Sequence, residues 1–129
     1  MFFLPVFALW IAFAQLFDRG EDYELYKDQI IITESQAAFG ETKSGGTAGV
    51  VGMIKNNSPV PWEDIRFHVE FFDTAGRRVD VAQKEQYQFY LPPHGALSFK
   101  VSFGREYPQT NYVKHSIQVA TAKDARARW

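Results

Sequence analysis

The chain has 129 residues, a formal net charge of −1, an isoelectric point near 6.3 and no cysteine. A charge balance this close to neutral gives no basic field for nucleic acid and no polybasic patch for anionic lipid, so neither is expected as a partner. The absence of cysteine excludes disulfides, thiolate nucleophiles and cysteine-based zinc sites, and the fold must therefore be held by packing alone.

The N-terminal residues 2–17 contain no charged side chain, whereas every Lys, Arg, Asp and Glu of the chain lies after them. Secretion and membrane-insertion machineries recognise an apolar N-terminal segment of this kind, which we call the head. As a helix it would span roughly 24 Å, short of the ~30 Å hydrocarbon core. Ala12-Phe13-Ala14 has the small-x-small form of a signal peptidase site. We therefore expect residues 1–17 to form an apolar helix that is a cleaved signal peptide or an uncleaved membrane anchor; burial in the domain is the third alternative.

The segment 18–28 is acidic and polar, with two tyrosines among its charges. Such a run predicts a solvated linker between the head and the domain. Its carboxylates lack the loop spacing and central glycine of an EF-hand, which argues against a calcium site.

Apolar residues recur with a period of two from Ile30 onward, which is the pattern of half-buried strands. Gly45 to Gly49 is rich in glycine and predicts a flexible loop, because it lacks the ending of a phosphate-binding loop and precedes a strand. Asp73 and Gly76 predict a tight hairpin turn, in which the carboxylate accepts a backbone N–H and the glycine takes a positive φ. The expected strands lie at 30–33, 50–54, 65–71, 79–81, 87–91, 97–103 and 113–119.

These elements predict an all-β domain at 29–123, followed by a basic tail at 124–129. About seven strands, each with one apolar face, favour an antiparallel β-sandwich, since each apolar face must meet another sheet. The remainder past the linker, about 100 residues, suffices for one core and leaves no room for a second domain.

Three motifs within residues 48–103 resemble the FxLYD-type domains of prokaryotic envelope proteins. They are the run VGMIKNNS at 51–58, which resembles the V-x-G-x-V-x-N-x-S start of that family, a strand that ends in Asp73 before a glycine turn, and a Leu-Pro-Pro-His-Gly step at 91–95 before Phe99. The F-x-L-Y-D motif that gives the family its name falls on residues 69–73, where only the Asp is kept. In the segment 91–95, His94 is an extra residue between the proline and the glycine. The resemblance implies an immunoglobulin or fibronectin III-like sandwich behind a signal or anchor, with no catalytic residues to carry over.

Catalytic motifs are missing from the sequence. His68, His94 and His115 are far apart, and no serine lies in a G-x-S-x-G or S-x-x-K motif. We therefore expect no enzyme and assign no catalytic, cofactor-binding or metal-binding residue. A small enzyme or metal-dependent accessory protein on the same sandwich is the alternative, and convergence of the three histidines with a carboxylate would favour it.

Four aromatic residues fall outside the inward strand positions or in loops, namely Trp62, Phe72, Tyr90 and Tyr112. Exposed aromatic side chains anchor interfaces, so these four form the candidate interface; packing beneath loops is the alternative. The sequence predicts an exported, non-catalytic binding or structural module, periplasmic, extracellular or membrane-anchored in a prokaryote. Its expected partner is another envelope protein or a second copy of the chain. If residues 1–17 are not cleaved, we expect this segment to hold the protein at the membrane.

Overall fold

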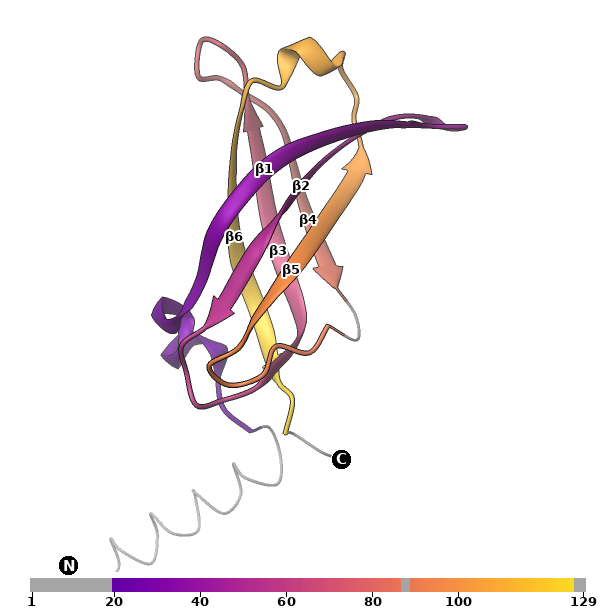
Figure 1. Ribbon diagram of the computed structural model, residues 1–129. Coiled ribbons are helices and arrows are strands. Elements are labelled where there is room, and N and C mark those ends of the chain that lie inside the picture. The colour runs from indigo at the N-terminus through magenta and orange to yellow at the C-terminus, as the bar shows by residue number, and fades with distance from the viewer. Residues whose placement is uncertain (1–19, 87–88, 127–129) are drawn as a thin grey trace, which may run out of the picture.

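The computed structural model describes residues 20–86 and 89–126 (Figure 1). The predicted signal or anchor at 1–17 lies outside the described residues, as do positions 87–88 and the last three residues of the tail. Within the described ranges, no helix has the length and hydropathy needed to cross a membrane.

Six strands make up the described domain, and they pair into two antiparallel sheets that face each other (Figure 1). One sheet has the order β1-β2-β5 and the other the order β4-β3-β6. The all-β sandwich predicted from the alternation is therefore confirmed, with six strands in the described part of the chain. The strands are β1 (Ile30–Thr42), β2 (Gly45–Asn56), β3 (Trp62–Phe72), β4 (Arg78–Gln86), β5 (Ala96–Gly104) and β6 (Lys114–Asp124).

The core lies between the two sheets and is built from the inward residues of the central strands. Phe67 of β3 and Phe99 of β5 stack across it with ring centroids 4.7 Å apart, and both are buried. Lys100, the neighbour of Phe99, is exposed. The inward and outward positions predicted for 65–71 and 97–103 are thus the observed ones.

Two expectations about strand positions are wrong. Gly45 to Gly49 belongs to β2, where Gly49 pairs with Ala38 on one side and Ser102 on the other. A Cβ atom at Gly49 would overlap the carbonyl oxygen of Val101, so glycine allows a close approach of two strands here. The expected strand at 87–91 is absent from its described part, where Leu91 forms only an isolated bridge with Trp62.

The hairpin between β3 and β4 has the predicted chemistry. The carboxylate of Asp73 accepts the backbone N–H groups of Ala75 and Arg77, each at 2.9 Å, and Gly76 has a φ of 80°. The hydrogen bond from the backbone of Arg77 holds the pKa of Asp73 below its ordinary value. The turn thereby fixes the register of β3 against β4.

The acidic segment before β1 is packed on the sandwich. It forms two short 3-10 turns, η1 (Tyr23–Leu25) and η2 (Lys27–Gln29). The ring of Tyr23 is 6% exposed and meets Trp62 edge-on at 5.4 Å between centroids. Burial, helped by the charges of Glu24 and Asp28, raises the pKa of Tyr23 to about 12. The charged side chains of this segment face solvent, while its first tyrosine extends the core.

Candidate functional site

Two of the four predicted interface residues are buried. Trp62 is 0% exposed and Tyr112 is 5% exposed, so the prediction that these rings face solvent is wrong. Trp62 begins β3 beneath Tyr23, and Tyr112 lies just before β6 with its ring edge-on to Phe71 at 5.2 Å. Each ring closes one end of the sandwich, because a ring at the margin of a strand covers core that the strands leave open.

The other two residues are accessible but lie apart. Phe72 is half-buried at the last position of β3, and Tyr90 is 50% exposed. Tyr90 adjoins Leu91, whose backbone pairs with Trp62 at the first position of β3. The two rings therefore lie near opposite ends of an eleven-residue strand and share no patch.

Trp62 is held by a buried polar network that Asn56 and Ser58 form. These two residues are the Asn-x-Ser part of the run at 51–58. The Asn56 amide donates to the carbonyl of Val60 at 2.7 Å, and its oxygen lies 2.6 Å from the Ser58 hydroxyl. The indole N–H of Trp62 donates to the same hydroxyl at 3.2 Å. Asn56 and Ser58 are both 0% exposed. The motif residues therefore satisfy buried polar groups at one end of the fold, which is a structural role.

Tyr112 ties the connection between β5 and β6 to β4. Its hydroxyl donates to the carboxylate of Asp80 at 2.8 Å and accepts the backbone N–H of Glu106 at 3.2 Å. Burial and the bond to Asp80 raise the pKa of this hydroxyl. The bond to a backbone group six residues upstream holds the chain where it crosses between sheets.

The three histidines have separate surroundings. His68 lies 3.3 Å from a carboxylate oxygen of Glu70, and His94 is in a turn with a φ of 58°. Nε2 of His115 is 2.9 Å from the Ser35 hydroxyl, and burial lowers the pKa of its ring. Among residues 20–86 and 89–126, no group of three or more His, Asp and Glu side chains gathers in a metal-binding arrangement.

A groove that was not predicted from the sequence lies at the side of the sandwich, where β1 of one sheet runs beside β6 of the other. We call it the edge groove; its volume is about 510 Å³. Ile31, on its wall, is 43% exposed. In the described structure, β6 pairs with β3 alone and no strand pairs along its other side. The edge groove is lined by Tyr23, Lys27, Asp28, Ile30, Ile31, Ile32, Ile117, Gln118 and Val119.

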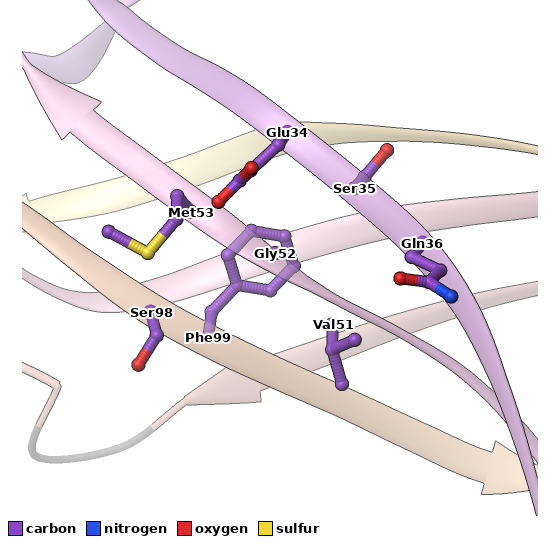
Figure 2. A pocket seen from close by; sticks show the side chains of 8 residues that line it. All are labelled: Glu34, Ser35, Gln36, Val51, Gly52, Met53, Ser98 and Phe99. Carbon is purple, nitrogen blue, oxygen red and sulfur yellow. The ribbon is translucent and has the colours of Figure 1, made fainter.

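A second hollow of about 540 Å³ opens on the β1-β2-β5 sheet. Figure 2 shows Met53 and Glu34 on one side of the Phe99 ring and Val51 and Gln36 on the other. Because Gly52 has no side chain, the ring of Phe99 forms the floor. The ring belongs to the core, so the hollow is a shallow dip in the sheet with one carboxylate at its rim.

The two ends of the described chain meet at Asp124, which the sequence analysis placed in a basic tail. This carboxylate is 1% exposed and accepts hydrogen bonds from the backbone N–H of Glu21 at 2.8 Å and from the Arg126 guanidinium at 2.9 Å. Burial raises the pKa of Asp124, but these hydrogen bonds outweigh it and the net shift is downward. Gly20, with a φ of 72°, leaves space for the carboxylate that a Cβ atom would fill.

No protein-family model matches the chain, and no curated protein sequence matches it. Among solved structures, it is similar to the Northeast Structural Genomics Consortium target SoR45, with a TM-score of 0.44 and 12% identity over 74% of this chain and 84% of that one. It is also similar to a DUF1425 family member from Shewanella sp. pv-4, with a TM-score of 0.42 and 15% identity over 72% of this chain and 95% of that one. Likeness at this level identifies neither a family nor an activity, so the FxLYD resemblance stays a prediction.

Proposed function

We propose that this protein is an exported, non-catalytic binding or structural module of the cell envelope that acts through protein–protein contacts. The observation that carries the proposal is the edge groove together with the unpaired side of β6. An open strand edge exposes backbone N–H and C=O groups that an extended segment of another chain can pair with. The apolar wall beside that edge adds a surface that such a segment would cover.

The sandwich is proposed to be of the immunoglobulin or fibronectin III type, as the FxLYD resemblance implies. Two features support this assignment. The order β1-β2-β5 opposite β4-β3-β6 matches strands A-B-E opposite C′-C-F, in which strand C′ extends the sheet that contains C and F. The Tyr112 hydroxyl bonded to the Glu106 backbone has the form of a tyrosine corner. In a seven-stranded domain of this type the last strand pairs with the sixth, and that place is the free side of β6 in the described chain.

Export is supported by the uncharged residues 2–17, whose length suits a signal peptide or a short anchor. Gly20, the first described residue, lies beside Asp124 at the end of β6. If the head is retained in the membrane, this end of the sandwich lies next to the bilayer. β1, β6 and the edge groove then remain accessible from the side.

Two measurements test the proposal in cells. Protease added to intact spheroplasts should digest the protein, because an exported domain lies outside the inner membrane. A photo-crosslinking amino acid at Gln118, on the edge groove, should give adducts in cells, whereas the same amino acid at Ser102, exposed on β5, should give few. Full protection from protease, or equal adducts at both positions, would contradict the proposal.

A further inference from the structure

We propose that the occupant of the β6 edge is β6 of a second copy of this chain, paired antiparallel about a two-fold axis at Ile117. This inference rests on the proposed function and deepens it, because it names the partner. The paired sheets would form one continuous six-stranded sheet in the order β4-β3-β6-β6-β3-β4. Three features of the described chain support this pairing: the chemistry of the β6 edge, the apolar wall beside it, and the self-complementarity of β6.

The edge of β6 is the least protected of the four sheet edges. Residues 115–122 carry no charge at neutral pH, since burial holds the pKa of His115 down. Charged residues and bulges on edge strands discourage pairing with other chains. Lys114 and Lys123 bound the uncharged segment and so confine pairing to it.

β6 has a bulge of its own at Ala120, but the uncharged residues 115–119 lie before it. Each of the other three edges also carries a protective feature. β4 has four charged residues, Arg78, Asp80, Lys84 and Glu85. On β5, the carbonyl of Lys100 already accepts a hydrogen bond from the Gln86 side chain at 2.9 Å. On β1, the register shifts at a bulge between Ile32 and Glu34. A pairing strand therefore meets the fewest obstacles at β6.

The apolar wall explains why the occupant needs alternating apolar residues. Ile117 and Val119 line the edge groove two positions apart on β6, and residues 30–32, all isoleucine, line it from β1. A strand added beside β6 points every second side chain toward this wall, because side chains alternate along a strand. His115, Ile117 and Val119 of a second β6 occur at that spacing.

The register about Ile117 brings compatible residues together. Ile117 lies opposite Ile117 of the second copy, and the inward-facing Val119 lies opposite His115. On the outer face, Ser116 lies opposite Gln118, so that polar side chains meet polar side chains. The two Lys114 residues lie at opposite ends, so no like charges face each other. The bulge at Ala120, between Val119 and Thr121, limits the regular pairing to residues 115–119.

The inference is tested with the full chain in nonionic detergent. Sedimentation velocity should show a monomer–dimer equilibrium that depends on protein concentration. The absence of native cysteine allows the register to be mapped with single cysteines. A mixture of Ser116→Cys and Gln118→Cys should form disulfide-linked dimers faster than either variant alone. Ser98→Cys mixed with Ser102→Cys, two exposed serines of the edge strand β5, is the matched control and should not.

A charge variant separates pairing through β6 from association through the head. Ser116→Glu with Gln118→Glu places carboxylates opposite each other and should weaken the dimer about tenfold or more. The exposed control pair, Ser98→Glu with Ser102→Glu, should leave it unchanged, and equal melting curves would show that both variants fold. A monomeric wild type, or a dimer that withstands the β6 charges, would overturn the inference. Adducts at Gln118 that contain only a different protein would overturn it while leaving the proposed function intact.

Discussion

The carboxylate of Asp124 accepts the backbone N–H of Glu21 at 2.8 Å, although 103 positions separate the two residues. The bond closes the sandwich at the end where the described chain both begins and ends (Figure 1). Residues 20–28 are therefore part of the domain that was expected to begin at 29.

Asp124→Asn should destabilise the domain by about 1–3 kcal/mol, because it removes a charged acceptor from four partly buried donor groups of Glu21 and Arg126. The effect should depend on pH. Since the folded pKa of Asp124 lies below its ordinary value of 3.8, its ionised form stabilises the fold above that value, and the contribution disappears as the pH falls through the folded pKa. Urea midpoints at neutral and acidic pH measure this. The gap between wild type and variant should close in acid; Glu106→Gln, at an exposed position, should show no gap.

Tyr23→Ala should cost about 3 kcal/mol, because it removes a buried ring that packs on Trp62. Leu25→Ala is the matched control in the same segment; Leu25 is 73% exposed, and its loss should change stability by less than about 0.5 kcal/mol. Denaturant midpoints of the two variants compare them. Equal costs would mean that residues 20–28 do not pack on the sandwich as described.

Gly49→Val and Gly76→Val test two different reasons for glycine. At Gly76 the φ of 80° disfavours a β-branched residue, at a cost of about 1–3 kcal/mol. At Gly49 the new side chain would meet the Val101 carbonyl inside the sheet, and we expect a cost of more than about 3 kcal/mol. Thermal melts and denaturant midpoints measure both. A smaller cost at Gly49 would place it in a loop, as its sequence alone predicts.

Asn56→Ala should destabilise the domain by about 3 kcal/mol, since the buried Ser58 hydroxyl and the Val60 carbonyl lose a partner. The exposed neighbour Asn57 provides the control, and Asn57→Ala should lie within about 0.5 kcal/mol of wild type. Urea unfolding followed by circular dichroism reports on both. A neutral Asn56→Ala would show that the network adds nothing to the stability of this end.

The sequence predicts the strands whose alternation is strong. Ile65 to Phe71 and Leu97 to Phe103 alternate without interruption, and both lie where expected. The hairpin at Asp73 also follows from local chemistry, because the residues that form the turn are adjacent. These elements need no information from distant parts of the chain.

The other parts of the fold, and the candidate site, depend on contacts between residues that are distant in the sequence. Residues 34–49 are polar and glycine-rich and show no alternation, yet they extend β1 and β2 because each pairs with the other along its length. Trp62 and Tyr112 fall outside the alternating runs, so only the packing of loops against the core decides their burial. The edge groove combines strands from two sheets and has no local signature beyond the uncharged run in β6.

The position of Asp124 also has a mechanical consequence. Because Glu21 and Arg126 both contact this one side chain, a force that pulls the two chain ends apart acts first on the hydrogen bonds at Asp124. Once these break, β6 is loaded from its last residue and peels from β3 one pair at a time, rather than sliding along its whole length. The domain is thus expected to yield at low force when stretched between its ends, and to resist better when it is pulled along β3.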